Sequence, residues 1–275
     1  MKPKISLAGD LGSGKSTVSD LLIADLGAEY YSTGSIVRSI AAKRGMTVTE
    51  LNVYMETHPE IDHEIDDGLV QLAGVDKFLI IDSRMAWHFT KGTFKVYMST
   101  DIETSALRIM NANRQGEHAA TLEETISQTR ARRESEKKRY KEQYGVDIKD
   151  LSNYDLVIDT TVATPREVAD SIAACFEEWK RTPDFKCVLI SPERLNYPDD
   201  EADTEYVSSL ATSLELGLGG IPEVSVFERD GEFYLLEGYE TALAHSFNMD
   251  RYIPARLVSA PENDTVKYVK MKNSL

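Results

Sequence analysis

Short apolar runs alternate with stretches of helical periodicity over about the first 180 positions of the chain. This alternation is typical of a parallel sheet covered by helices. The apolar runs predict strands, and apolar residues spaced three or four apart predict the helices between them. We expect strands at Lys4–Ala8, Glu29–Tyr31, Lys77–Asp82, Thr93–Met98 and Leu156–Asp159. We expect helices at Thr17–Leu26, Thr33–Arg44, Thr47–Glu56, Glu60–Ala73, Ile102–Asn111, Leu122–Tyr144 and Pro165–Trp179.

The pattern changes after the segment Arg181–Asp184. From there the chain predicts a hairpin around Asp230–Gly231, because Asp-Gly between two apolar runs is a strong turn signal. The change predicts a first domain over residues 1–182, a smaller α+β domain over 183–260 and a loosely held tail over 261–275. The elements expected here are Lys186–Ile190, Thr204–Leu216, Val224–Glu228, Phe233–Glu237, Tyr239–Phe247 and Ala255–Val258.

A complete phosphate-binding loop, GDLGSGKS, occupies residues 9–16 directly after the first predicted strand. Glycines allow backbone N–H groups to close around a β-phosphate, Lys15 reaches the β- and γ-phosphates, and the Ser16 hydroxyl is placed to hold Mg²⁺. The helix that follows points its positive end at the phosphates. ATP and Mg²⁺ are therefore the expected ligands. The predicted ATP-binding residues of this segment are Gly9, Asp10, Leu11, Gly12, Ser13, Gly14, Lys15, Ser16 and Thr17.

Four further stretches, taken in order with this loop, carry a family likeness. They are residues 31–38 (YSTGSIVR), 59–66 (PEIDHEID), 134–142 (ESEKKRYKE) and 153–159 (NYDLVID). In this order they resemble the cytidylate kinases, above all the compact archaeal type. The resemblance implies an α/β fold with a nucleoside-monophosphate-kinase-like parallel sheet, ATP-dependent phosphoryl transfer and an arginine-rich lid. It also implies that Thr33, Arg38 and Arg84 bind the acceptor.

Basic residues crowd the helix predicted at 122–144, which is the lid of this resemblance. Phosphoryl transfer spreads negative charge over the γ-phosphate oxygens, so arginines on a closing segment suit that chemistry. Arg132 is the main catalytic candidate of this helix, and Arg130 is a further ATP-binding candidate. The alternative is a solvated basic face paired with glutamates at helical spacing. The residues concerned are Arg130, Arg132, Arg133, Lys137, Lys138 and Arg139, with Glu134, Glu136 and Glu142.

An acid ends the predicted strand at 77–82 and is followed by Ser83 and Arg84. The carboxyl end of such a strand lies at the active crevice. There Asp82 either positions Mg²⁺ or takes a proton from an acceptor hydroxyl; the alternative is that it caps a helix. The order Asp-Ser-Arg is similar to the acid-Arg-Ser signature of deoxynucleoside kinases, which phosphorylate a hydroxyl. Lys15, Asp82, Arg84 and Arg132 are the predicted catalytic residues, and Ser16 and Asp82 the predicted metal ligands.

Residues 186–259 resemble a ParB/sulfiredoxin-type module. The resemblance rests on residues 188–192 (VLISP), the GIP at 220–222, the hairpin that ends at Gly238 and residues 252–258. Relatives of this module handle DNA, bind CTP or phosphorylate free serine, and they carry arginines or histidines just after the glycine. Here Tyr239 and Glu240 follow it. We therefore expect a docking or substrate-presenting domain with a local DNA contact.

Composition narrows the possible partners. A net charge of −15 disfavours a general electrostatic grip on nucleic acid. Cys175 and Cys187 are the only cysteines, too few for a disulfide framework or a structural metal cluster. No apolar stretch approaches the ~20 residues that cross a bilayer, so we expect no membrane partner and a cytoplasmic location (the host cytoplasm if the protein is viral).

Three functions from different classes follow from these features. The favoured one is a kinase acting on the hydroxymethyl group of 5-hydroxymethyluracil in DNA, implied by the cytidylate-kinase-like domain combined with a DNA-associated module, as in the phage base-hypermodification kinases. The first alternative is a free CMP or dCMP kinase, which leaves the second domain unexplained. The second alternative is a nucleotide-dependent switch without kinase chemistry.

Overall fold

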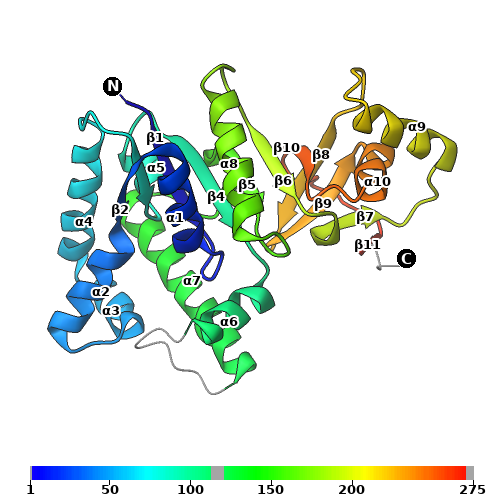
Figure 1. Cartoon of the computed structure of the whole chain (residues 1–275). Coiled ribbons are helices and arrows are strands. Elements are labelled where there is room, and N and C mark those ends of the chain that lie inside the picture. The colour runs from blue at the N-terminus through cyan, green and yellow to red at the C-terminus, as the bar shows by residue number, and fades with distance from the viewer. Residues whose placement is uncertain (1, 113–120, 271–275) are drawn as a thin grey trace.

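The computed structural model describes residues 2–112 and 121–270. Within them the chain forms one twisted sheet with helices on its faces (Figure 1). The strand order across the sheet is β11-β7-β9-β8-β10-β6-β5-β4-β1-β3-β2. The strands are β1 (Lys4–Gly9), β2 (Glu29–Ser32), β3 (Leu79–Asp82), β4 (Phe94–Ser99), β5 (Leu156–Asp159), β6 (Cys187–Ile190), β7 (Leu195–Pro198), β8 (Val224–Arg229), β9 (Glu232–Glu237), β10 (Ile253–Leu257) and β11 (Tyr268–Lys270).

The helices cover this sheet and supply the walls of its crevices. Several begin at capping boxes or side-chain caps, as at Thr47, Asp101 and Thr164, which satisfy the free N–H groups of the first turn. The helices are α1 (Lys15–Leu26), α2 (Thr33–Arg44), α3 (Val48–Met55), α4 (Pro59–Leu72), α5 (Ala86–Phe89), α6 (Ile102–Asn111), α7 (Leu122–Tyr144), α8 (Pro165–Trp179), α9 (Thr204–Glu215) and α10 (Tyr239–Phe247), with 3₁₀ turns η1 (Leu151–Asn153) and η2 (Pro192–Arg194).

Strands β2, β3, β1, β4, β5 and β6 run parallel, so their carboxyl ends meet at one edge of the sheet. Strand β1 lies in the middle of this group, and its Ile5 and Leu7 are fully buried between two helical layers. Leu7 pairs with Asp82 of β3 on one side and with Val96 of β4 on the other. The loop after β1 is therefore held where the parallel strands end, which is where ligands bind in open α/β sheets.

The sheet continues without a break from residues 2–182, the N-terminal portion, into residues 183–270, the C-terminal portion. Leu156 of β5 pairs with Cys187 of β6 in the parallel direction. One apolar cluster also spans both portions, joining Ala8 and Tyr97 of the first to Val226 and Phe233 of the second. The two portions thus share a sheet and a core. Domain limits at 182 and 260 remain a prediction.

The structure confirms most predicted elements and corrects two expectations. Strand β7 was not predicted, and the tail predicted to be loosely held contains β11, which pairs with β7. Ion pairs fasten the same segment, since Lys270 lies 2.8 Å from Glu232. The predicted hairpin turn is confirmed, because Asp230 and Gly231 have φ values of +55° and +85°, as a type I′ turn requires.

Within residues 2–112 and 121–270, none of the helices is long and apolar enough to cross a membrane. No three His, Cys, Asp or Glu side chains of these residues are grouped so that they could hold a metal ion.

Candidate active site

The loop between β1 and α1 has the backbone shape of a phosphate cradle. Gly12 and Gly14 have φ values of +71° and +84°, which residues other than glycine rarely adopt. A Cβ on Gly12 would lie 2.5 Å from the carbonyl oxygen of Ser105, so only glycine allows α6 to approach the loop this closely. The loop opens into the first turn of α1, whose N–H groups and positive dipole end suit an anion. The predicted phosphate-binding segment is thus brought together by the fold.

Lys15 lies against this loop and is partly buried. Its Nζ donates hydrogen bonds to the carbonyl oxygens of Gly9 at 3.1 Å and Asp10 at 2.8 Å. Burial and the nearby charge of Arg84 lower the pKa of Lys15 to about 7, although Asp82 acts in the opposite direction. A polyanion bound in the loop would favour the charged form, so ligand binding and protonation of Lys15 are linked.

This linkage gives a prediction for the pH dependence of ATP binding. Above pH 7 free Lys15 is largely neutral, whereas the phosphates of bound ATP raise its pKa. ATP binding at pH 8 is expected to take up close to one proton, and ATP affinity to fall as the pH rises above 7. Calorimetry in two buffers of different ionisation enthalpy measures this uptake. The Lys15→Met variant, which has no group to titrate, serves as the control; equal uptake in both proteins would refute the assignment.

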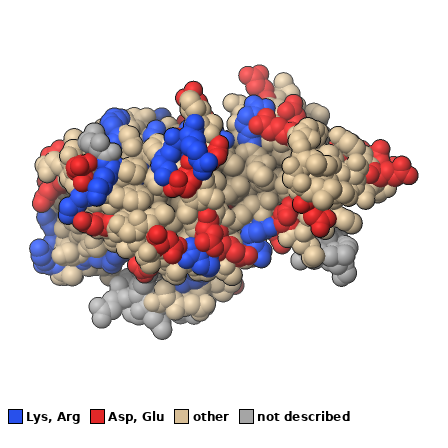
Figure 2. Space-filling model, turned by 45° about the horizontal axis from the view of Figure 1, so that its top comes forward, with Lys and Arg blue, Asp and Glu red and all other residues tan. Residues whose placement is uncertain are grey.

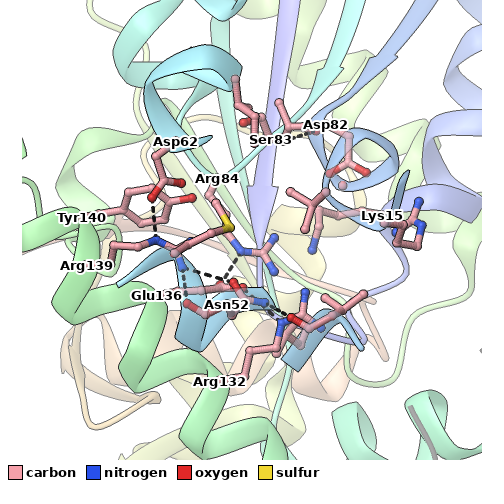
Figure 3. A pocket seen from close by; sticks show the side chains of 18 of the residues that line it. Lys15, Asn52, Asp62, Asp82, Ser83, Arg84, Arg132, Glu136, Arg139 and Tyr140 are labelled. Carbon is pink, nitrogen blue, oxygen red and sulfur yellow. Dashed lines mark hydrogen bonds and ion pairs between the residues drawn. The ribbon is translucent and has the colours of Figure 1, made fainter. Parts of the chain in front are cut away.

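A cavity beside the phosphate loop gathers most of the predicted acceptor and catalytic side chains (Figure 3). Its walls come from the loop, from α2, α3 and α4, from the end of β3 and from α7. Sequence reasoning placed Lys15, Ser16, Thr33, Arg38, Asp82, Arg84 and Arg132 here, and all of them line it. The lining residues that were not among the predicted site residues include Asn52, Asp62, Asp66, Glu136, Arg139 and Tyr140.

Two arginines of this cavity share one buried carboxylate. Arg84 Nε lies 2.8 Å from Glu136 Oε2, and Arg132 Nε lies 3.2 Å from Glu136 Oε1. Burial alone would raise the pKa of Glu136, but Arg84 and Arg132 outweigh it and lower the pKa to about 2. The pKa of Arg84 is raised by the same contact, against the effect of its own burial. Glu136 is therefore ionised at neutral pH, and it holds the two guanidinium groups at the cavity.

Arg139, one turn further along α7, makes a second buried ion pair in the wall. Its Nε lies 2.9 Å from Asp62 Oδ2 on α4. Its Nη1 donates to the backbone oxygen of Asn52 at 3.1 Å and to Oδ1 of the same residue at 3.3 Å. This pair ties α3 and α4 to α7 and leaves polar groups of Asn52 and Asp62 at the cavity surface.

Asp82 ends β3 at the edge of the sheet, as predicted. Its Oδ2 accepts a hydrogen bond from the hydroxyl of Tyr30 at 2.9 Å. The helix-capping alternative is excluded, because the next helix, α5, begins at Ala86 after an N-cap at Met85. The carboxylate of Asp82 and the hydroxyl of Ser16 line the same cavity. Carboxylate and hydroxyl oxygens are suitable ligands for Mg²⁺, so these two residues fit the metal role predicted for them.

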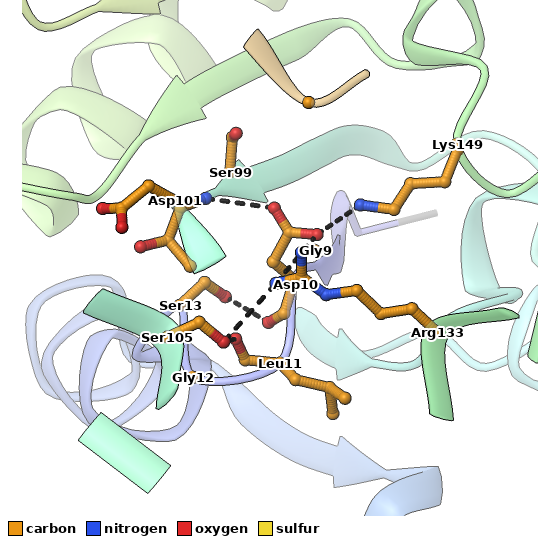
Figure 4. A network of polar contacts seen from close by, with 12 residues as sticks. Gly9, Asp10, Leu11, Gly12, Ser13, Ser99, Asp101, Ser105, Arg133 and Lys149 are labelled. Atoms are coloured by element: carbon orange, nitrogen blue, oxygen red, sulfur yellow. Dashed lines mark hydrogen bonds and ion pairs between the residues drawn. The ribbon is translucent and has the colours of Figure 1, made fainter. Parts of the chain in front are cut away.

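The side chain of Asp10 is held by other residues of the protein (Figure 4). Its carboxylate accepts hydrogen bonds from the Tyr97 hydroxyl at 2.9 Å and from the N–H of Thr100 at 3.1 Å, and it pairs with Lys149. Its own N–H donates to the carbonyl oxygen of Met98 at 2.9 Å.

These contacts anchor the loop to the sheet, and the predicted ATP contact of Asp10 stays a prediction. Burial would raise the pKa of Asp10, but Lys149 and Arg133, the latter 3.6 Å away, lower it to about 2.

The basic residues of α7 divide into several groups. Arg132 and Arg139 face the cavity, whereas Arg133 turns toward Asp10. Lys137 and Lys138 are exposed, as the solvated-face alternative predicts, but their partners at 3.8 Å are Asp147 and Glu56 outside α7 and not the glutamates that this alternative named. Arg130 is exposed and does not line the cavity, so its ATP contact remains a prediction.

A second hollow lies on the other side of the phosphate loop. It is bounded by the loop, α1, α6 and the segment that links β5 to α8. Arg108 of α6 donates to the carbonyl oxygens of Thr160 at 2.7 Å and Thr161 at 3.1 Å. The apolar sides of the hollow and its position next to the phosphate loop suit the base of a bound nucleotide. No sequence motif pointed to Arg108. The residues lining this hollow include Gly12, Gly14, Thr17, Val18, Arg108, Ile109, Thr160, Ala163 and Pro165.

Comparison with known proteins gives one consistent result for the N-terminal portion. The sequence profile of the cytidylate kinase-like family matches residues 4–162. The cytidylate kinase of Thermoplasma volcanium is 36% identical over 182 residues, covering 65% of this chain and 93% of that protein. The cytidylate kinase of Methanothrix thermoacetophila is 40% identical over 156 residues, covering 57% of this chain and 87% of that protein.

Two other similarities are partial. A protein of Lacinutrix mariniflava named S-adenosylmethionine-dependent nucleotide dehydratase is 37% identical over 179 residues, covering 65% of this chain. The match spans only 37% of that relative's length. Among solved structures, shikimate kinase from Acinetobacter baumannii is 19% identical with a TM-score of 0.45, covering 66% of this chain and 97% of that one. That structural similarity is too low to inform the assignment.

Proposed function

Because the chain belongs to the cytidylate kinase-like family, we propose that it transfers the γ-phosphoryl group of ATP to a pyrimidine nucleoside monophosphate, CMP or dCMP. The observation that carries this proposal is the cavity in which Lys15, Arg38 and the ion-paired Arg84 and Arg132 surround one space. Several fixed cations around a small cavity suit a site in which two phosphate groups meet.

The chain's own residues supply positioning and charge. Arg38 and Arg84 hold the acceptor phosphate, and the loop with Lys15 holds the donor phosphates. Lys15 and Arg132 stabilise the charge that develops on the transferred group during in-line attack by an acceptor oxygen. A monophosphate is already ionised, so this attack needs no general base. Ser16 and Asp82 would hold Mg²⁺, which when bound would supply positive charge beside the donor phosphates.

A kinase of 5-hydroxymethyluracil in DNA, the acceptor favoured by the sequence alone, is the second candidate. The Asp82 carboxylate supports it, since an alcohol acceptor benefits from a base at the cavity and Asp82 lies there with Tyr30. A base in a duplex would have to be flipped to reach this cavity. The negative charge of the C-terminal portion disfavours the proposed local DNA contact. Residues 183–275 hold 17 Asp and Glu against 8 Lys and Arg, and acidic side chains are prominent at the right-hand end of the face in Figure 2.

The experiment that separates these functions offers CMP, dCMP and DNA containing 5-hydroxymethyluracil with γ-labelled ATP and Mg²⁺. We expect the label to enter the free nucleotides. Label in the modified DNA alone would overturn this proposal in favour of the second candidate. ATP binding without transfer to any of the three would favour the nucleotide-dependent switch.

The Asp82→Asn variant adds a mechanistic readout to the same assay. With a monophosphate acceptor we expect a fall in kcat that higher Mg²⁺ partly restores, because the residue only helps to hold the metal. With an alcohol acceptor, loss of a general base costs about 10²- to 10⁴-fold and added metal restores nothing. Asp76→Asn, a surface change at the turn before β3, is the matched control. Wild-type turnover by Asp82→Asn would remove Asp82 from both mechanisms.

A further inference from the structure

Arg194 of the C-terminal portion lies buried behind the second hollow, the one that suits the nucleotide base. It follows β6 in η2, and its Nε is 3.6 Å from Asp159 Oδ1 at the end of β5. Its other two nitrogens face the β8–β9 hairpin, where Nη1 donates to Glu232 Oε1 and Nη2 to the carbonyl oxygen of Gly231, both at 3.0 Å. Lys270 of β11 also pairs with Glu232. One guanidinium group thus connects the end of β5 to a turn that is distant in the sequence.

Asp159 in turn fixes the segment that forms a wall of the base hollow. Its Oδ1 accepts hydrogen bonds from the N–H of Thr161 at 3.1 Å and from the Thr161 hydroxyl at 2.6 Å. The same hydroxyl oxygen accepts from the N–H of Asp101 at 3.2 Å, and Asp101 caps α6. The carbonyl oxygens of Thr160 and Thr161 are therefore presented to Arg108, which also reaches Gly12 of the phosphate loop at 3.4 Å.

The buried carboxylate of Asp159 needs the positive charge of Arg194 if it is to keep its contacts with Thr161. Asp159 is almost fully buried, and its Oδ2 has no hydrogen-bond partner among the residues that the structure describes. Burial raises the pKa of Asp159, while Ser191, Thr161 and Arg194 act in the opposite direction. Removing one partner of a buried ion pair leaves an uncompensated charge, which the surroundings must relieve by protonation or by movement. Either response changes how Asp159 holds Thr161.

We propose that Arg194 is a positioning residue of the donor-nucleotide site, so that the C-terminal portion forms a structural part of that site. Through Asp159 it sets the position of residues 160–161 and hence the width of the hollow next to the phosphate loop. This inference rests on the proposed function to the extent that ATP is taken as the donor. It gives the C-terminal portion a role that requires no DNA contact.

The test compares Arg194→Met with Arg194→Lys and with the double variant Asp159→Asn/Arg194→Met. The dissociation constant of ATP is measured by calorimetry, and KM is measured separately for ATP and CMP. We expect Arg194→Met to raise the dissociation constant and KM of ATP about tenfold and to leave the KM of CMP unchanged. Arg194→Lys should restore part of the loss. The double variant should restore most of it, because the Asp159→Asn change removes the uncompensated charge and keeps a side-chain oxygen that accepts from Thr161.

Arg256→Met is the matched control, since Arg256 makes an exposed ion pair with Glu223 in the same portion, 2.9 Å long, with no contact to the donor site. Unchanged ATP affinity in folded Arg194→Met would overturn the inference. So would an equal rise in the KM of both substrates, which a general loss of structure produces. If Arg194→Met does not fold, the lysine and double variants decide by the same ATP measurement. Wild-type protein that binds ATP but transfers no phosphate would refute only the proposed function, whereas absence of ATP binding would refute both.

Discussion

Replacing Lys15 by methionine is expected to lower kcat about 10³-fold. Methionine keeps the length and apolar stem of the side chain but removes the charge that lies beside the phosphate loop, 2.8 Å from the carbonyl oxygen of Asp10. That charge is partly shielded from water, so it interacts with developing phosphate charge more strongly than it would in bulk water. Steady-state kinetics with saturating ATP and CMP measure the effect. A variant that keeps more than about a tenth of wild-type kcat would remove Lys15 from the chemistry.

Stability measurements distinguish a loss of catalysis in Lys15→Met from a loss of folded protein. The folded-state pKa of Lys15 lies below its ordinary value, so the charged form is disfavoured by folding at neutral pH. Without ATP, Lys15→Met should therefore unfold at a temperature no lower than that of the wild type. Lys91→Met is the matched control, since Lys91 is exposed and donates to the carbonyl oxygen of its neighbour His88. It should change neither kcat nor stability.

Most elements of the N-terminal portion were predictable because their signals are local, whereas the short helix α5 was not predicted. Buried parallel strands read as continuous apolar runs, and capped amphipathic helices show both their period and their first residue. The bounds predicted for α6, α7 and α8 agree with the structure to the residue. Strands β7 and β11 escaped prediction because they are short and pair only with distant segments, so their few residues carry no pattern of their own.

The candidate site likewise has a part with a local sequence signal and a part that depends on contacts between distant positions. The phosphate loop is contiguous, so its spacing alone located Lys15 and Ser16. Glu136 was predicted only as a partner on a solvated face, because its burial depends on β3 bringing Arg84 against α7 across 52 positions. The anchoring of Asp10 by Lys149 spans 139 positions. Neither contact leaves a local signal, and only a fold or a set of co-varying sequences would reveal them.

Replacing Arg84 by methionine is expected to lower kcat/KM for the nucleotide acceptor about 10³-fold, as loss of a fixed arginine at a phosphoryl-transfer site does. Arg84 faces the cavity beside Lys15 and is held there by its 2.8 Å contact with Glu136. The change should also alter the pH linkage described above. Arg84 helps to lower the pKa of Lys15, so its removal raises that pKa and reduces proton uptake on ATP binding at pH 8. Unchanged uptake would refute the electrostatic coupling between Arg84 and Lys15.

Glu136 provides the second half of this test, because it contacts Arg84 and Arg132 and is expected to act through them. Glu136→Gln leaves two guanidinium groups without their shared counter-ion, so activity should fall about 10- to 10²-fold and stability should drop by about 3–5 kcal/mol. Glu136→Asp, which keeps the charge, should recover part of both losses. Glu134→Gln on the exposed face of α7 is the matched control.

If Glu136 works only by holding Arg84, the double variant Arg84→Met/Glu136→Gln should be no less active than Arg84→Met alone. Losses that multiply in the double variant would instead give the carboxylate a role of its own at the acceptor, in which case Arg84 and Glu136 contribute separately to transfer.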